Sequence, residues 1–505
     1  MKKVLFFLII VRIFSVYLVQ TFFSPDEYWQ SLEVAHKIIY GYGHLTWEWS
    51  QGIRSYLHPV IISILYKILA VLKFDSVDFL VYLPRIFQAL LSAYADYRFY
   101  NWCNKKKWSL FIVATSWFWF YTGGRTIINS FEASLTTIAL SYFPWRSKDE
   151  NTRFLWIVMF LTYIRPTSAL TWAPICIYHL KKSQFSLKDL IIKRYILIGL
   201  ILSTFLVAID TFFHGSFVIT PLRFFKFNVL NSVGSFYGQH PFHWYLSSGL
   251  PAVLGINIIP FSFAALNILK NFNENSVDKV LLSSIGVTLL GYSLLSHKEF
   301  RFLLQILPLC LFITANYLSK WSRTKSKFYI WIVATVIFVA NVIPAGYLGF
   351  VHQQGPLKVV NRLAKIAEKY ELEQGKPPYF FFMMPCHSTP YYSHIHVNVT
   401  MRFLTCEPPL QNDNKKYIDE SEKFYEAPMK WIRTHLPVHP ITALPTHIVL
   451  YDTLLPKVND FLSIYKPIDL FFNSDHLVSS RSGRNILLYE RVHHEDKTGY
   501  LESMP

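Results

Sequence analysis

Long apolar segments recur through the first two thirds of this chain, and they constrain its fold more than any other feature. A run of about 20 apolar residues can cross a bilayer as a helix, which satisfies its own backbone hydrogen bonds in lipid. Only 16% of the 505 residues are charged, whereas soluble domains have about 25%. We therefore predict an all-α polytopic membrane protein with about ten to twelve transmembrane helices. The apolar runs are 4–23, 57–73, 77–100, 108–121, 126–145, 154–180, 192–213, 247–270, 279–296, 299–319 and 327–350.

Positive charge is concentrated between these apolar runs. The chain has 49 Lys and Arg against 32 Asp and Glu, which gives a formal net charge of +17. Such an excess suggests nucleic-acid binding in a soluble protein, but short basic loops between spans are typical of the cytoplasmic side of a membrane. We therefore expect no nucleic-acid partner. The basic loops are 105–107, 146–148, 181–182, 193–194 and 320–327.

Three longer segments are predicted to be luminal, namely 24–56, 214–246 and 351–505. The last of them is polar and mixed, and it contains strand-like runs at 379–384 and 447–451. It is long enough for a small domain. The sequence therefore predicts a transmembrane module over 1–350, followed by a mixed α/β luminal domain over 351–505.

Two features of the C-terminal region fit a luminal location. Asn398-Val399-Thr400 is an acceptor sequon, so Asn398 is a candidate glycosylation site. Cys386 and Cys406 can form a disulfide if the region lies in an oxidising lumen. The chain contains no C-x-x-C motif, and its other three cysteines lie in or beside apolar runs, where we interpret them as small hydrophobic residues. No metal site is predicted.

Acidic residues stand where the first apolar run ends. Lys2 and Lys3 precede that run and no small-residue cleavage site follows it, so we interpret it as a retained signal anchor. Asp26 and Glu27 then face the lumen. Ionisable groups at a membrane boundary often mark function, but Ser24-Pro25-Asp26-Glu27 is also typical of a helix start. Both interpretations stay open on the residues alone, as does a role for the acidic Glu48 further along.

The motifs that are absent from the sequence narrow the chemistry. The chain has no Walker loop, G-x-G-x-x-G, H-E-x-x-H or nucleophile elbow. Glycosyl transfer from a lipid-phosphate donor remains, and it needs a carboxylate base and cations for the departing phosphate. Asp26 or Glu27 can be the base, and His297, Lys298 and Arg301 can hold the phosphate. Alternatively, these three residues form an interfacial turn with snorkelling side chains.

Several motifs resemble those of a known family. Pro25-Asp26-Glu27 resembles the H-P-D-E signature of the dolichyl-phosphate-mannose-dependent mannosyltransferases, with Ser24 in place of His. The fuller stretch 25–36 resembles the branch that adds the third mannose to the glycosylphosphatidylinositol (GPI) core. Stretch 384–392, with Met401-Arg402-Phe403-Leu404, favours this branch over the N-glycan branch. Further matching stretches follow in order: 42–49, 52–55, 125–132, 238–241 and 297–302.

The resemblance implies a GT-C fold with its active site at the luminal face of the endoplasmic reticulum membrane. It implies inverting transfer of mannose from dolichyl-phosphate-β-mannose, forming an α-1,2 bond on a GPI precursor that carries two mannoses. Asp26 is then the expected base, with Glu27 beside it. No cofactor or metal is expected, because side-chain cations can stabilise a lipid-monophosphate leaving group. The candidate substrate-binding residues are Glu48, Arg125, His240, His297, Lys298 and Arg301, the last three near the donor phosphate.

Some of these residues also have plainer interpretations. Arg125 and Arg165 lie in apolar context, where pairing with a carboxylate is the favoured role for both. His240 and His243 are more often ordinary loop histidines than ligands. We also retain the hypothesis that the C-terminal domain shapes the acceptor site.

Three other functions are weighed against the third-mannose reading. A sister mannosyltransferase would act on the fourth GPI mannose or on the dolichol-linked N-glycan precursor. A transporter or flippase would show paired half-chain repeats, and none is evident. A structural subunit would use Asp26 only as a helix cap, so that Asp26→Asn would be nearly silent.

Overall fold

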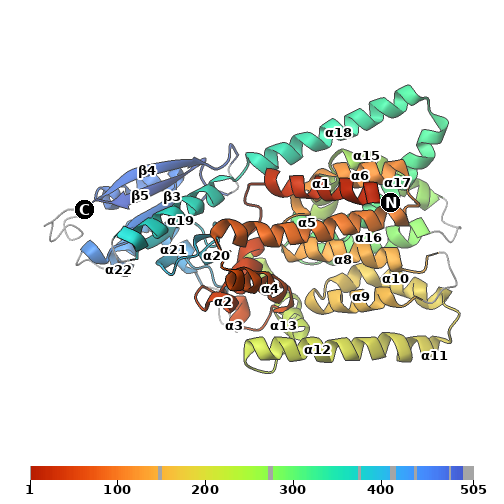
Figure 1. Ribbon diagram of the computed structural model, residues 1–505, viewed down its shortest axis with the longest axis horizontal. Coiled ribbons are helices and arrows are strands. Elements are labelled where there is room, and N and C mark those ends of the chain that lie inside the picture. Colours follow the sequence, from red (N-terminus) through yellow and green to blue (C-terminus); the bar gives the residue numbers. More distant parts are fainter. Residues whose placement is uncertain are drawn as a thin grey trace. The chain divides into compact units, whose positions relative to one another are not determined.

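The structure is a computed structural model and is mainly helical (Figure 1). It describes residues 2–145, 151–231, 233–270, 277–373, 377–409, 417–436, 441–476 and 479–492. The basic loop predicted at 146–148 lies outside the described residues. Contacts between Cα atoms divide the chain into two compact units. The first unit comprises Met1–Val19, Glu48–Ile64 and Tyr82–Gly346, and the second comprises Gln20–Trp47, Leu65–Val81 and Tyr347–Pro505.

Helices form the first unit and the segments that join it to the second. Apolar side chains dominate these helices, and many of them are exposed on the isolated chain, as expected for surfaces that face lipid. In chain order the α-helices are α1 (Lys2–Leu18), α3 (Trp47–Ser50), α4 (Leu57–Leu72), α5 (Val77–Trp102), α6 (Lys107–Thr115), α7 (Trp117–Thr122), α8 (Ile128–Tyr142), α9 (Arg153–Ile164), α10 (Ser168–Lys182), α11 (Leu187–Leu190), α12 (Leu197–His214), α13 (Thr220–Phe225), α14 (Leu250–Leu254), α15 (Ile258–Lys270), α16 (Val277–Ser293), α17 (Leu307–Trp321) and α18 (Lys327–Phe350).

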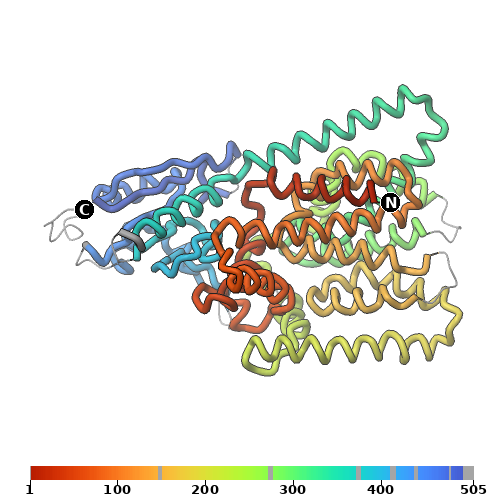
Figure 2. The backbone as a smooth tube through the Cα atoms, viewed as in Figure 1, coloured from red at the N-terminus to blue at the C-terminus, as the bar shows by residue number. Residues whose placement is uncertain are grey.

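The first unit is a helical bundle. Helix α9 packs between α8 and α12, α10 packs on α16, and α17 packs on both α6 and α15. Helices α11 and α12 are joined by a π-helical turn into one continuous rod, which Figure 2 shows as an unbroken stretch of tube.

Three helical stretches among the described residues are long and apolar enough to cross a membrane: Leu187–His214, Tyr245–Lys270 and Lys327–Tyr370. The apolar helices Leu57–Leu72 and Arg153–Ile164 are shorter. An apolar run in the sequence can be longer than the helix it forms. The run at 108–121, for example, is divided at Ser116 into α6 and α7. The predicted number of ten to twelve spans therefore stays a prediction.

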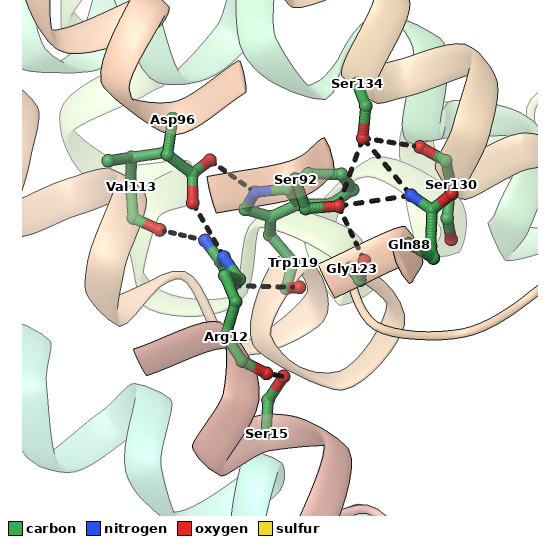
Figure 3. Close-up of polar contacts among 10 residues, drawn as sticks. All are labelled: Arg12, Ser15, Gln88, Ser92, Asp96, Val113, Trp119, Gly123, Ser130 and Ser134. Carbon is green, nitrogen blue, oxygen red and sulfur yellow. Dashed lines mark hydrogen bonds and ion pairs between the residues drawn. The ribbon is translucent and has the colours of Figure 1, made fainter. Parts of the chain in front are cut away.

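A polar network fastens α1 inside the bundle (Figure 3). The Nε atom of Arg12 lies 2.6 Å from Asp96 Oδ2, and both side chains are buried. Asp96 also accepts a 2.7 Å hydrogen bond from Trp119 Nε1, and Arg12 donates to the carbonyl oxygen of Val113 at 2.9 Å. A buried charge is costly without such partners. The network therefore ties α1 to α5, α6 and α7.

The second unit contains a five-stranded mixed sheet of order β2-β1-β3-β5-β4. Strand β1 pairs parallel with β2 and β3, whereas β5 pairs antiparallel with β3 and β4. The strands are β1 (Tyr379–Met383), β2 (Thr400–Phe403), β3 (His447–Tyr451), β4 (Tyr465–Phe472) and β5 (Asn485–Arg491). The helices are α2 (Glu33–Tyr40), α19 (Gly355–Glu373), α20 (Tyr392–Ile395), α21 (Glu420–Glu426), α22 (Pro428–His435) and α23 (Leu455–Leu462).

Both faces of this sheet are covered. Side chains alternate along a strand, so Phe381 and Met383 of β1 enter a core with residues of α22 and α23, such as Trp431 and Phe461. Helix α19 packs against β4 and β5. The strands predicted at 379–384 and 447–451 are confirmed as β1 and β3, and the mixed α/β character of this region is confirmed with them.

The N-terminal segment 20–47 belongs to the second unit. Its backbone bonds to the last turn of α18 and to the chain just after it, from Gln20 N to Gly349 O at 2.7 Å and from Phe22 N to Gln353 O at 2.9 Å. A π-helical turn (Tyr28–Leu32) then continues into α2, which ends at Gly41 with φ +81°. Glycine is suited to that left-handed cap. The division at residue 350 predicted from the sequence stays a prediction.

Candidate active site

The acidic motif opens the helical segment Tyr28–Tyr40. The amides of Tyr28 and Trp29 both donate to the carbonyl oxygen of Pro25 at 3.0 Å, so the helical turn begins where the sequence predicted a helix start. The side chain of Glu27 is buried, whereas that of Asp26 is half-buried. Asp26 is therefore the more accessible carboxylate of the pair.

Trp29, one turn beyond the acidic motif, is surrounded by aromatic rings that we call the Trp29 collar: His44, His387, Tyr391 and Phe403. The ring centroids lie 5.9, 4.5, 5.2 and 5.0 Å from that of Trp29, respectively. The indole itself is buried. Three of the collar rings come from the C-terminal region, so the second unit brings the motifs at 25–36 and 384–392 together.

His387 lies where the collar meets Asp26. Burial, with a smaller contribution from His44, lowers the pKa of His387 to about 4, although the Asp26 carboxylate acts in the opposite sense. The imidazole is therefore neutral at physiological pH. The backbone of His387 has φ +58°, a conformation that costs free energy and often occurs at functional sites.

Cys386 and Cys406, whose pairing the sequence left open, are joined by a disulfide. Cys406 Sγ lies 3.9 Å from Nδ1 of His387, and Cys386 directly precedes His387 in the chain. The disulfide therefore restrains the position of this histidine. The Cys386, His387 and Cys406 ligand atoms lie within 4.8 Å of one another, a spacing that a metal ion could bridge. A metal ion binds cysteine as a thiolate, and neither cysteine is a thiolate while the disulfide is formed. We therefore interpret the cluster as a covalent brace for this loop.

A second polar group lies in the first unit and is built on the loop after α16. The guanidinium of Arg301 binds Glu299, with Nε 2.6 Å from Oε2. His297 Nε2 lies 3.0 Å from Glu299 Oε1. Lys298 Nζ donates to the carbonyl oxygen of His240 at 3.1 Å. The structure therefore brings together the four predicted residues His240, His297, Lys298 and Arg301, which we call the cationic loop.

Glu299 is the residue of this group that the sequence analysis did not assign. Burial alone would raise its pKa, but the Arg301 charge and the hydrogen bond from His297 hold the pKa of Glu299 well below its usual range. Burial lowers the pKa of Lys298. The sequence signal that could have identified Glu299 is its position between the predicted cations Lys298 and Arg301. Glu299 orients Arg301 and partly offsets its charge.

Glu48 is paired with Arg54. Its Oε1 accepts bonds from Arg54 Nε at 2.9 Å and Nη2 at 2.6 Å. The residues after Arg54 are fastened by Asp210 of α12, which accepts from Tyr56 N at 2.9 Å and from Thr220 Oγ1 at 2.8 Å. Asp210 was not anticipated, although a lone carboxylate within an apolar run is itself a signal.

Arg125 has a structural setting. Its Nε donates to the carbonyl oxygen of Tyr121 at 3.1 Å, and its guanidinium lies 4.3 Å from the centroid of the Tyr121 ring. Arg165 binds the buried Glu132 at 2.7 Å. The Arg165–Glu132 pair matches the carboxylate pairing favoured from the sequence. The contacts of Arg125 with Tyr121 do not test such a pairing, and the substrate-binding assignment of Arg125 stays a prediction.

Comparison with known proteins decides the family. A model of the Alg9-like mannosyltransferase family matches residues 3–396. GPI mannosyltransferase 3 of Drosophila melanogaster is 50% identical, over 97% of this chain and 93% of the relative. This chain belongs to the Alg9-like mannosyltransferase family. It is therefore a glycosyltransferase. GPI alpha-1,2-mannosyltransferase 3 of Homo sapiens is 39% identical, over 96% of this chain and 86% of the relative.

The fold of this mannosyltransferase has a counterpart among solved structures. ArnT from Cupriavidus metallidurans, in a crystal structure bound to undecaprenyl phosphate, superimposes with a TM-score of 0.53 and covers 96% of this chain and 97% of its own. The identity is 10%, so the likeness shows the fold alone. It agrees with the expected GT-C-like architecture of a helical membrane module with a smaller C-terminal domain.

The mannosyltransferase presents its glycosylation candidate at the surface. Asn398 is exposed and lies two residues before β2, in the same loop system as α20. An exposed loop asparagine is accessible to modification. Its use stays a prediction.

Proposed function

We propose that this enzyme transfers the third mannose, in α-1,2 linkage and with inversion, from dolichyl-phosphate-β-mannose to the two-mannose GPI precursor. The observation that carries this proposal is the 39–50% identity, over 96–97% of the chain, with relatives whose names specify GPI mannosyltransferase 3. A sister enzyme acting on the fourth GPI mannose or on the N-glycan precursor has less support, because the relatives at this level of identity bear the third-mannose name.

Asp26 is our proposed base. General base catalysis needs a carboxylate that reaches the acceptor hydroxyl, and Asp26 is the more accessible of the acidic pair, whereas Glu27 is buried. His387 of the Trp29 collar interacts electrostatically with the Asp26 carboxylate. The collar includes residues 387, 391 and 403, which supports the hypothesis that the C-terminal domain shapes the acceptor site.

The cationic loop is our proposed phosphate-binding element. A departing dolichyl phosphate develops negative charge that fixed cations stabilise, and Arg301, Lys298 and His297 offer donors on one short loop. Glu299 holds the Arg301 fork in place, and bidentate guanidinium groups suit phosphate oxygens. Side-chain cations suffice for a lipid monophosphate, so we propose no metal and no cofactor. We place this chemistry at the luminal face of the endoplasmic reticulum membrane.

The experiment that tests the function uses microsomes from cells that lack this enzyme. The microsomes receive labelled dolichyl-phosphate-mannose, and the GPI lipids are separated with and without wild-type enzyme. We expect a two-mannose lipid to be converted to a three-mannose lipid whose new label is released by an α-1,2-specific mannosidase. Conversion of a three-mannose lipid to four, or labelling of the N-glycan precursor alone, would replace this function with that of a sister enzyme.

A further inference from the structure

One face of the helical segment Tyr28–Tyr40 is bonded to the C-terminal region along its length. Trp29, Glu33 and His36 are spaced by four and three residues, which places them on one helical face. Trp29 Nε1 donates to the carbonyl oxygen of Thr389 at 2.9 Å, and His36 Nε2 lies 3.0 Å from Nδ1 of His396. All of these residues belong to the second unit. Glu33 makes the central contact of this face.

Glu33 is a fully buried carboxylate that accepts an unusually complete set of bonds. Its Oε1 accepts from Tyr391 N at 2.9 Å, from Ser393 N at 3.1 Å and from Ser393 Oγ at 2.5 Å, and its Oε2 accepts from Ser393 N at 3.1 Å. Burial raises the pKa of Glu33 to about 7, although these bonds favour the charged form. Because burying a carboxylate costs free energy, the contacts of Glu33 are weak evidence that it stabilises the fold. They instead indicate that Glu33 fixes the geometry of this region.

The bonds of Glu33 reach the surroundings of Asp26 in two short steps. Tyr391 is a ring of the Trp29 collar, 5.2 Å from the indole centroid. Trp29 in turn bonds through its amide to Pro25, the residue before Asp26. Fixing segment 391–393 therefore fixes the collar, and the collar fixes the helical turn that bears Asp26.

We propose that Glu33 is a positioning residue for mannose transfer: by anchoring Tyr391 and Ser393 it sets the orientation of the Asp26 turn and of the collar beside it. This inference rests on the proposed role of Asp26. Glu33 is expected to act on turnover more than on donor affinity, because its complete burial keeps it from touching substrate. A small misplacement of a reacting group costs about 100-fold in rate.

Glu33→Gln is the informative variant. The amide keeps the shape of the side chain and one acceptor oxygen, but the NH₂ group that replaces the other oxygen faces the Ser393 N–H, which is itself a donor. We expect kcat to fall by about 10- to 100-fold per folded molecule, with KM for dolichyl-phosphate-mannose within about twofold of wild type. Glu368→Gln, at an exposed position of α19, is the matched control and should leave kcat unchanged.

A double-mutant cycle with Ser393→Ala asks whether Glu33 acts through the C-terminal segment. Residues that act through one contact give non-additive effects, so Glu33→Gln with Ser393→Ala should lower kcat little more than Glu33→Gln alone. Strictly multiplicative effects, or a Glu33→Gln enzyme with wild-type kcat per folded molecule, would overturn the proposal. A loss confined to the yield of folded protein would reduce Glu33 to a structural residue and would overturn it as well.

Hydrogen exchange separates this proposal from the proposed function, since it needs no substrate. In Glu33→Gln the amides of Tyr391, Ser393 and Trp29 should exchange at least tenfold faster than in wild type, while those of β3 stay protected. If these amides exchange faster in Glu33→Gln but the wild-type enzyme does not transfer mannose to the two-mannose lipid, the proposed coupling between Glu33 and the Asp26 turn stands. The proposed third-mannose function is then wrong. Unchanged exchange at Trp29 would remove the coupling whatever the activity.

Discussion

The indole Nε1 of Trp29 donates a 2.9 Å hydrogen bond to the carbonyl oxygen of Thr389, across a sequence separation of 360 residues. This bond joins the two stretches that most strongly resemble the mannosyltransferase branch, one directly after the first helix and one inside the C-terminal domain. The acidic motif is therefore a composite element, because its aromatic surroundings are supplied mainly by residues from the other end of the chain. Its properties should respond to changes at both ends.

Asp26→Asn should abolish mannose transfer while leaving the enzyme folded. Asparagine keeps the ability to cap a helix, but it cannot accept the proton of the acceptor hydroxyl, and loss of a general base costs about 10²- to 10⁴-fold in rate. The check is the initial rate of labelled transfer at matched expression. Glu27→Gln is the companion variant. A normal rate for Asp26→Asn would mean that the base lies elsewhere and that the motif is a cap.

Replacing Cys386 and Cys406 together by serine should destabilise the second unit by about 3 kcal/mol, as the disulfide closes a loop with a sequence separation of 20. Transfer should also fall, because His387 loses its brace beside Asp26. Thermal unfolding in detergent measures the first effect and the transfer assay the second. Cys176→Ser, which alters a free cysteine, should change neither. Equal unfolding midpoints for wild type and the double variant would show that the disulfide is not formed in the native enzyme.

Much of the local structure was predictable from the sequence. The strands at β1 and β3 follow from β-branched and aromatic residues in short runs, and the start of the helical segment follows from Pro25-Asp26-Glu27. The clustering of His297, Lys298 and Arg301 follows from their adjacency in the chain. These are short-range properties, which the order of residues largely determines.

The remaining features depend on contacts between distant residues, which one sequence does not reveal. Nothing in the spacing of Glu33 and Ser393, or of Arg12 and Asp96, shows that the two side chains are bonded. The number of spans was unpredictable for another reason. A polar residue such as Ser116 ends a helix without interrupting the apolar run, so hydropathy alone cannot locate the break.

Arg301→Lys should raise KM for dolichyl-phosphate-mannose by about 10-fold or more, since lysine keeps the charge but loses the two-pronged geometry, and hydrogen bonds to charged groups contribute about 1.5–3 kcal/mol. Lysine also keeps Glu299 paired with a cation, so the loop should remain folded. Donor titrations in the transfer assay give KM. Lys325→Gln, at an exposed position outside the cationic loop, is the control. An unaltered KM would assign Arg301 to a purely structural pairing with Glu299.

Acidification should destabilise the enzyme partly through His387. Its folded pKa of about 4 lies below the ordinary value of 6.5, so the unfolded chain binds a proton that the folded chain excludes. The stabilising contribution is present above pH 6.5 and is lost as the pH falls towards 4, by about 2 kcal/mol at pH 5. His387→Asn removes this titration, and asparagine tolerates the positive φ. The drop in unfolding midpoint from pH 7 to pH 5 should therefore be smaller in the variant. Equal drops would contradict the prediction.

The buried pair of Arg12 and Asp96 should be sensitive to the loss of one partner and tolerant of the loss of both. Asp96→Asn leaves a buried guanidinium without its counter-charge, which costs about 3–5 kcal/mol, whereas replacing both members by apolar residues is often neutral. We therefore expect Asp96→Asn to lower the unfolding midpoint strongly, and Arg12→Met with Asp96→Leu to lower it less, although Trp119 Nε1 also loses its acceptor.

Thermal unfolding of the single and double variants in the same detergent gives the coupling between the two side chains. A double variant less stable than Asp96→Asn would show that the pair is needed for more than mutual neutralisation, for example to hold α1 at α6 through the bond from Arg12 to Val113. A fully stable Asp96→Asn would contradict the prediction. Because α1 leads directly into the acidic motif, transfer by a folded double variant also tests how firmly the bundle must hold α1 for Asp26 to work.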